Sequence, residues 1–308
     1  MRTTFSTMLA AMLATACMLV VQPAGGASAG GSLAFTAAGA KELEFNTGVL
    51  KGKLRAGGKS TGLSSVVHLP TGLILDSSMG LLGHYRVFSA NQRYGNAAWD
   101  WPSDARLRPD GSVEVCWTSA EDRPFELRAN YRWAAPDTLD LETIVQARTN
   151  LAKFESFLGS YFSGGFTNSC VYARSNGQAC LIRADKSIGI WQAFPRDDEA
   201  VSTIQDGRWK FPPSPVDWVI RPYLVKPLGV RRCPANELQA LLMSPPRDCF
   251  AVLTPFETEG HRSMYLSLFG RDLKTGETAR ARARLVIGTN LSGETIESLC
   301  AAYLRQSP

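Results

Sequence analysis

The stretch that decides the fold is a run of nine residues whose side chains alternate: Phe125-Glu126-Leu127-Arg128-Ala129-Asn130-Tyr131-Arg132-Trp133. Its odd-numbered residues are apolar or aromatic, and its even-numbered residues are charged or carry an amide. Successive side chains of a strand point to opposite faces of a sheet, so this period of two predicts a strand with one buried face. Pro136-Asp137 then predicts a turn into a second strand at 139–145, antiparallel to the first.

Shorter runs predict further strands separated by turn residues. The expected strands are 113–117, 171–174, 181–183, 188–193, 218–220, 250–253 and 264–269. Asn176-Gly177 is the clearest hairpin signal, because both central residues of a type I′ turn need a positive φ. Within 279–287, apolar residues alternate with Arg280, Arg282 and Arg284, which favours a half-exposed strand with a solvated arginine face over a nucleic-acid patch.

Helix signals are few. Residues 235–243 predict a short helix, and residues 292–304 predict a terminal helix with Ser292 as its N-cap. Residues 194–227 are rich in proline but also hold several large aromatic residues, which predicts a long ordered loop instead of a linker. The sequence therefore predicts an all-β protein, in which a single large antiparallel β-sandwich with a short C-terminal helix occupies residues 41–308.

The N-terminal residues indicate export. Arg2 precedes an almost wholly apolar run at 8–21, and Ala27-Ser28-Ala29 is a small-residue cleavage pattern. This layout predicts a signal peptide at 1–29, a flexible leader at 30–40 and a secreted or periplasmic protein. A lipoprotein box ending at Cys17 is the alternative reading. The apolar run is too short for a membrane span, and none is expected after signal cleavage.

Cysteine content fits an oxidising compartment. Once Cys17 leaves with the signal, an even set remains: Cys116, Cys170, Cys180, Cys233, Cys249 and Cys300. An even set in an exported chain favours disulfides, with Cys233–Cys249 expected first and Cys170–Cys180 second. Unpaired buried thiols are the alternative.

Charge and missing motifs exclude several classes. The formal net charge of +5 is too mild to favour nucleic acid as a partner. The chain has three histidines, His68, His84 and His261, whose scattered spacing predicts no metal site, and it has no dinucleotide or phosphate-loop motif, so no cofactor is expected. His68 lies on an apolar segment and reads as a structural histidine.

The segment 84–102 mixes aromatic and hydrogen-bonding residues without a steady period. A wall that binds a sugar needs both kinds, because rings stack on the apolar face of the sugar while polar groups hold its hydroxyls. The expected binding residues are Tyr85, Arg86, Arg93, Tyr94, Trp99 and Trp101, with Arg208 and Trp209 as a second wall. The alternative is a sandwich corner whose aromatic residues fill the core.

Three residues are candidates for proton transfer. His84 lies inside the segment and is the first candidate, because imidazole is the natural acid or base near neutral pH. Asp100 lies between two tryptophans, and Glu155 lies between Phe154 and Phe157. Aromatic neighbours desolvate a carboxyl and raise its pKa, so either residue is a possible partner for His84.

Residues 138–143 and Gly159-Ser160-Tyr161-Phe162 resemble the large β supersandwich of galactose-mutarotase-like proteins, and the chain also resembles secreted bacterial proteins with no assigned activity. The first resemblance implies a fold that serves sugar mutarotases, epimerases and domains of polysaccharide lyases and glycosidases. No position of this chain matches the catalytic histidine pair and glutamate of the mutarotases, so no catalytic residue is carried over.

The sequence thus favours an exported protein that binds a carbohydrate or polysaccharide. If it is an enzyme, proton transfer on a glycan is expected, as in an epimerase, lyase or hydrolase. The alternatives are a non-catalytic glycan-binding module and a structural protein of the cell envelope.

Overall fold

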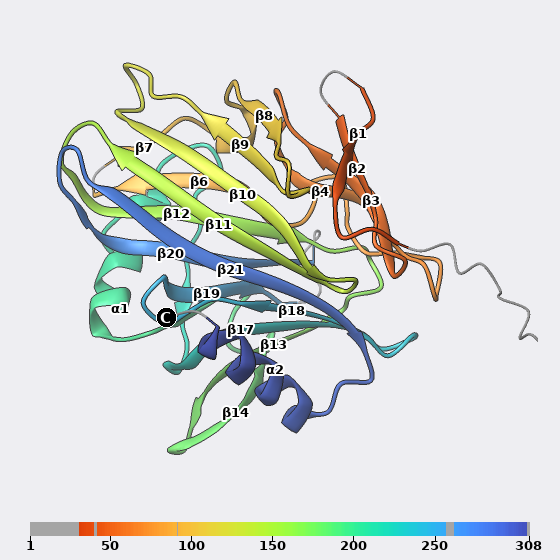
Figure 1. Ribbon diagram of the computed structural model, residues 1–308. Helices are drawn as coiled ribbons and strands as arrows, with labels where there is room; N and C mark the ends of the chain where they lie inside the picture. The colour runs from red at the N-terminus through yellow and green to blue at the C-terminus, as the bar shows by residue number, and fades with distance from the viewer. Residues whose placement is uncertain (1–30, 40–41, 91, 257–261, 307–308) are drawn as a thin grey trace, which may run out of the picture. The chain divides into compact units, whose positions relative to one another are not determined.

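The computed structural model describes residues 31–39, 42–90, 92–256 and 262–306. The expected signal peptide and His261 lie outside the described residues. Strands dominate the described part of the chain and form three sheets there, two of them large (Figure 1). The all-β prediction is therefore confirmed. No helix in this part of the chain is long and apolar enough to cross a bilayer.

The largest sheet has nine strands in the order β14-β13-β17-β18-β21-β11-β10-β9-β8. Their bounds are β8 Asp104–Leu107, β9 Val113–Trp117, β10 Phe125–Ala135, β11 Thr138–Ala147, β13 Asn168–Ser175, β14 Gln178–Arg183, β17 Leu224–Cys233, β18 Leu238–Met243 and β21 Thr278–Thr289. The alternating run lies in β10, where Phe125, Leu127 and Tyr131 are buried and Arg132 is exposed, as predicted. β10 pairs antiparallel with β11, which confirms the predicted neighbours.

The second large sheet has seven strands in the order β16-β15-β19-β20-β12-β6-β7. Their bounds are β6 Gly83–Ser89, β7 Gln92–Arg93, β12 Leu151–Tyr161, β15 Trp191–Pro195, β16 Val219–Ile220, β19 Cys249–Pro255 and β20 Ser263–Leu273. A third sheet of five strands is formed by β1 Phe35–Ala37, β2 Glu42–Asn46, β3 Leu50–Arg55, β4 Gly62–His68 and β5 Leu73–Ile74.

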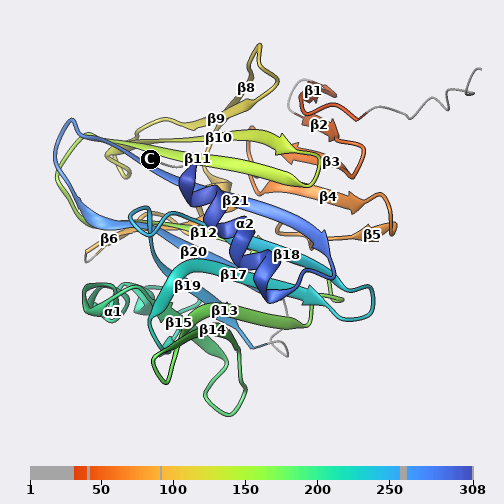
Figure 2. The ribbon, with the colours of Figure 1, turned by 60° about the horizontal axis from the view of Figure 1, so that its bottom comes forward.

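The main hydrophobic core lies between the two large sheets. Leu127 of β10 and Leu141 of β11 contribute from one sheet, and Leu158 of β12 and Leu266 of β20 contribute from the other. Figures 1 and 2 show β10, β11 and β21 lying over β12 and β20. Each fully buried leucine of this kind stabilises the fold by about 1.5–3 kcal/mol, so the sandwich provides a rigid frame for both outer faces.

Each large sheet is also covered on its outer side. The terminal helix α2, Gly293–Arg305, packs Ile296 and Tyr303 against Val230 and Leu241 of the nine-stranded sheet (Figure 2). Ser292 caps this helix by accepting from the Thr295 backbone N–H at 3.1 Å, as predicted. The seven-stranded sheet is covered by residues 198–218, which we call the covering segment; it holds α1, Asp198–Ile204, and the short helix η2, Arg208–Lys210.

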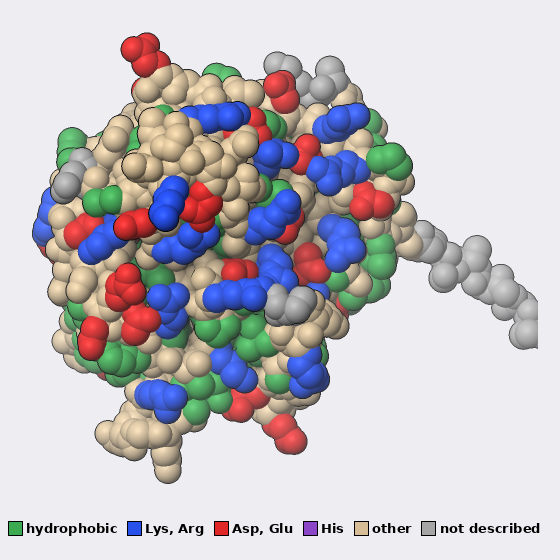
Figure 3. Space-filling model, turned by 60° about the vertical axis from the view of Figure 1, so that its left-hand side comes forward, with side chains coloured by type: hydrophobic (Ala, Val, Ile, Leu, Met, Phe, Trp, Pro, Cys, Tyr) green, Lys and Arg blue, Asp and Glu red, His purple; other side chains and the backbone are tan. Residues whose placement is uncertain are grey.

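Local turn chemistry was predicted correctly. Ser175 pairs with Gln178, and Asn176 and Gly177 both have positive φ, so the expected hairpin joins β13 to β14. The apolar residues of β21 are buried, whereas Arg280 is exposed and pairs with Glu142 at 3.0 Å. Figure 3 shows the same mixing of basic and acidic side chains over one face of the molecule.

The helix predicted at 235–243 is wrong. Residues 238–243 form β18, which is buried throughout and pairs with β17 and β21. A short apolar run buried on both faces of a sheet has no period of two, so its sequence cannot be distinguished from a buried helix. Helix α1 was not predicted, because residues 194–227 were expected to form a long ordered loop. In the structure Asp197 is its N-cap and accepts from the Ala200 N–H at 2.9 Å.

Neither expected disulfide is present in the described part of the chain. Cys180 and Cys249 are both free thiols. Cys180 lies opposite Ala173 in the β13–β14 ladder and not opposite Cys170. The expectation of these two disulfides is therefore not borne out.

Candidate functional site

A pocket opens on the outer face of the seven-stranded sheet, beneath the covering segment. Its volume is about 170 Å³. We call it the aromatic pocket; it is lined by Tyr85, Arg86, Phe157, Trp191, Trp209, Ser214, Pro215, Val216, Trp218 and Tyr265. The strands β6, β12, β15 and β20 supply its floor, and the covering segment supplies its wall.

A β-bulge explains why two successive residues reach this pocket. Arg86 pairs with Phe157 and His84 with the next residue, Leu158, so Tyr85 is an extra residue in the β6 strand. A regular strand would point Tyr85 and Arg86 to opposite faces, whereas a bulge re-aims a side chain and lets both face outward. Val87 then returns to the main core. Bulges of this kind are common beside functional sites.

The rings of the pocket hold one another in fixed positions. Tyr85 stacks on Trp99 with ring centroids 4.4 Å apart and an interplanar angle of 3°. Trp209 meets Phe157 edge-on at 4.7 Å and Trp218 edge-on at 5.3 Å. Tyr85 and Trp218 remain partly exposed. The pocket therefore presents a preformed aromatic surface to solvent.

Arg86 is the charged group of this pocket and is only 3% exposed. Its Nη2 donates to the Ser214 carbonyl at 2.8 Å and to the Tyr85 phenol at 3.2 Å. Its Nε and Nη1 are buried and have no hydrogen-bond partner among the described residues. Its guanidinium carbon lies 5.2 Å from the centre of the Trp209 ring. Arg86 is thus held by neutral groups and an aromatic face, and two of its N–H groups, at Nε and Nη1, remain available to a ligand.

Arg93 lies close to Arg86 and holds the part of the covering segment at Phe211 and Pro213 in place. Its Nη1 donates to the carbonyls of Phe211 at 3.3 Å and Pro213 at 2.6 Å, and its Nη2 donates to the carbonyl of Asn96. Burial and the positive charge of Arg86 lower the pKa of Arg93 to about 10. Arg93 does not line the pocket, but its positive charge lies near that of Arg86.

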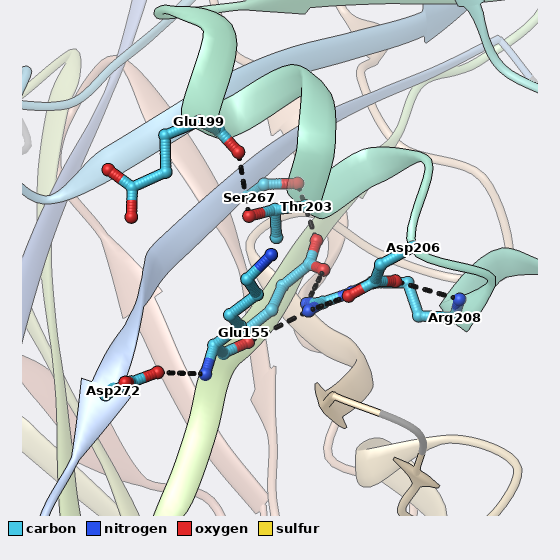
Figure 4. Close-up of polar contacts among 8 residues, drawn as sticks. Glu155, Glu199, Thr203, Asp206, Arg208, Ser267 and Asp272 are labelled. Atoms are coloured by element: carbon cyan, nitrogen blue, oxygen red, sulfur yellow. Dashed lines mark hydrogen bonds and ion pairs between the residues drawn. The ribbon is translucent and has the colours of Figure 1, made fainter.

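Glu155 belongs to a separate buried network on the same sheet face (Figure 4). It accepts from Arg208 Nη1 at 2.8 Å and from Ser267 Oγ at 2.7 Å. Arg208 also donates from Nη2 to Asp206 at 2.8 Å and to the Lys153 carbonyl at 3.1 Å. Burial raises the pKa of Glu155, against the opposing effect of Arg208. The network joins β12 to the covering segment, and Glu155 does not line the aromatic pocket.

His84 faces the interior between the two large sheets. It is fully buried, its Nε2 lies 2.9 Å from Thr143 Oγ1 of β11, and its ring centroid lies 5.3 Å from that of Trp117. Burial lowers the pKa of His84 to about 3, so the imidazole is neutral near pH 7. Asp100 is exposed at the end of η1, Ala98–Asp100, in a shallow hollow beside Gly57. The structure therefore does not bring His84, Asp100 and Glu155 together.

The remaining expected binding residues separate into two groups. Tyr85, Arg86 and Trp209 line the aromatic pocket. Tyr94, Trp99 and Trp101 are buried in the corner after β6, each at most 6% exposed. Tyr94 pairs with Ser89 at 2.8 Å, and Trp101 packs in the main core. His68 is also buried and contacts Thr71 at 2.8 Å, which fits its structural reading.

Sequence reasoning missed Phe157, Tyr265 and Trp218 as pocket residues. Phe157 and Tyr265 come from β12 and β20, which lie more than a hundred residues apart in sequence. Trp218 had a visible signal, since residues 209–218 hold Trp209, Phe211 and Trp218 within one polar, proline-rich stretch.

No family model and no curated protein matches this chain. Solved structures do. A galactose 1-epimerase from Lactobacillus acidophilus NCFM is 10% identical with a TM-score of 0.51, over 83% of this chain and 98% of that one. A galactose mutarotase related enzyme from Lactobacillus acidophilus is 9% identical with a TM-score of 0.50, over 82% and 98%.

The chain has the galactose-mutarotase-like fold. This confirms the resemblance inferred from sequence. At about 10% identity the likeness concerns the fold alone, and function has to be argued from the site. In this chain the outer face of the seven-stranded sheet carries the aromatic pocket and the Glu155–Arg208 network.

Proposed function

We propose that this chain is an exported protein that binds a carbohydrate in the aromatic pocket. The observation that supports it is a preformed ring surface around a buried guanidinium with unused donors. Aromatic faces stack on the apolar C–H face of a sugar, and fixed donors hold its oxygens. The carbohydrate-related fold is consistent with this proposal. The export part rests on the signal pattern at 1–29.

The pocket fits a small ligand. Its volume of about 170 Å³ lies below the roughly 300–1,000 Å³ of sites that enclose drug-sized molecules. One sugar ring, or the end of a glycan chain, is therefore the expected ligand. No carboxylate or imidazole lines it among the described residues, which favours binding without acid–base catalysis.

A second candidate is an enzyme that transfers a proton on the bound sugar. Tyr85 favours it, because its phenol oxygen lies 3.2 Å from Arg86 Nη2 at the pocket, and tyrosine can act as a general acid or base. In that case Tyr85, and not His84, is the residue placed to reach the ligand.

A glycan array combined with a product screen tests both candidates. Trp218→Ala should weaken binding at least tenfold, because the indole ring on which the sugar would stack is lost. The core between the two large sheets does not contain Trp218 and is left intact. Tyr223→Ala is the matched control, because Tyr223 is 41% exposed and lies outside the pocket. Turnover that disappears in Tyr85→Phe while binding persists would favour the enzyme. A folded protein that binds no glycan contradicts both candidates.

A further inference from the structure

We propose that the ligand is an acidic sugar, such as a uronic acid, whose carboxylate accepts hydrogen bonds from Arg86. This inference rests on the proposed function, because it names the class of carbohydrate that the aromatic pocket takes.

The first step is that Arg86 carries a charge that the protein does not neutralise. An arginine cannot lose its proton in a protein, so burial leaves a full positive charge in the pocket wall. Arg86 makes no ion pair among the described residues; its partners are one carbonyl, one phenol and ring faces. Burying a charge without an ion-pair partner is unfavourable, and an anionic ligand would offset this unfavourable energy.

The second step is that unused donors remain at the same group. Nε and Nη1 of Arg86 are buried without acceptors among the described residues, and a buried donor left without an acceptor destabilises the protein. Sugar hydroxyls would satisfy the donors but not the charge. A carboxylate satisfies both, and its hydrogen bonds to guanidinium are about twice as strong as neutral ones.

The third step is that Arg93 reinforces the preference. Its guanidinium lies near Arg86 and is held by the carbonyls of Phe211 and Pro213, which are neutral. One positive group in the wall of an aromatic pocket, with a second one behind it, matches a ligand with one anionic end and one apolar ring face. A uronic acid has this division of chemistry within a single ring.

Isothermal titration calorimetry with glucuronate, galacturonate and their neutral parents tests the inference on the wild-type protein. We expect the dissociation constant for at least one uronate to be tenfold or more below that of its parent. Arg86→Gln should bring the dissociation constants for the uronate and its neutral parent together, whereas Arg86→Lys should keep part of the difference. Arg106→Gln is the matched control, because it removes one positive charge at an exposed position on β8.

The outcomes separate this inference from the proposed function. Equal affinities for uronate and parent in the wild-type protein would overturn the acidic-sugar preference and leave carbohydrate binding standing. Acetate that binds alone as tightly as a uronate would also overturn it, since the site would then take any small anion. No binding of any sugar would remove the proposed function, and this inference with it. Because the wild-type comparison is decisive, the test holds even if a variant at Arg86 unfolds.

Discussion

Arg86 and Arg208 are two buried arginines on one sheet face, and they differ in whether a carboxylate of the protein neutralises their charge. Both lie beside aromatic rings, Arg86 at 5.2 Å from the Trp209 ring and Arg208 at 5.9 Å from the Phe88 ring. Arg208 has two carboxylate partners, Glu155 and Asp206. Arg86 has none among the described residues. A charge neutralised inside the protein stabilises its framework, whereas an unneutralised charge is available to a ligand.

His84 provides a third case on the same strand as Arg86. It is also buried, but it can lose its proton, and burial lowers its pKa to about 3. Arginine lacks this option. The difference between these three groups can be measured, because each predicts a distinct response to substitution or to pH.

The largest expected effect separates the two arginines by stability. Arg208→Met should lower the free energy of unfolding by about 3–5 kcal/mol, because it leaves Glu155 buried and uncompensated. Arg86→Met should change it by less than about 1 kcal/mol or raise it, because an unpaired buried charge is removed. Urea unfolding of both variants measures the difference. Equal losses would mean that Arg86 has an internal partner of comparable strength.

The double variant Glu155→Leu/Arg208→Met is the control for this comparison. It removes both members of the buried pair, and apolar replacements of such a pair are often tolerated. We expect it to be more stable than Arg208→Met alone. Additive losses would contradict the view that an uncompensated Glu155 causes the defect.

An effect that is smaller over any one pH unit should follow pH through His84. Its folded pKa of about 3 lies below the unfolded value near 6.5, so the unfolded state binds the proton first as pH falls. Stability should therefore decrease by about 1.4 kcal/mol per pH unit below pH 6.5 and level off near pH 3. His84→Gln should lack this contribution, so the difference between the two unfolding curves isolates it. Parallel curves would show that the pKa of His84 is the same in the folded and the unfolded protein.

The smallest effect is expected at a surface arginine. Arg280 pairs with Glu142 at 3.0 Å, and their side chains are 59% and 32% exposed. Solvent screens such a pair, so Arg280→Ala should change stability by less than about 1 kcal/mol. A loss of unfolding free energy as large as that of Arg208→Met would contradict this expectation. It would indicate that burial does not decide how much an arginine contributes to stability.

The sequence predicted the parts of this molecule that depend on neighbouring residues. The alternation at 125–133 and the Asn176-Gly177 turn are local, and both were correct. β18 was missed because it is buried on both faces and its run lacks a period of two. Tyr85, Arg86 and Trp209 were expected to bind a ligand, and they do line one pocket.

The rest of the site depends on pairing between distant segments. The bulge at Tyr85 is defined against β12, so the strand sequence alone could not tell that Tyr85 and Arg86 share a face while His84 faces inward. Glu155 was read as a catalytic candidate because of its aromatic neighbours, but its partner Arg208 lies 53 residues away in the chain. The catalytic roles suggested for His84, Asp100 and Glu155 remain predictions.

A crystal structure of the protein with glucuronate or galacturonate tests the central claim most directly. The account predicts the sugar ring against Tyr85 or Trp218 and its carboxylate within hydrogen-bond distance of the Arg86 guanidinium. A uronate bound elsewhere, such as the larger hollow lined by Arg132 and Tyr303, with the Arg86 donors still unoccupied, would contradict it.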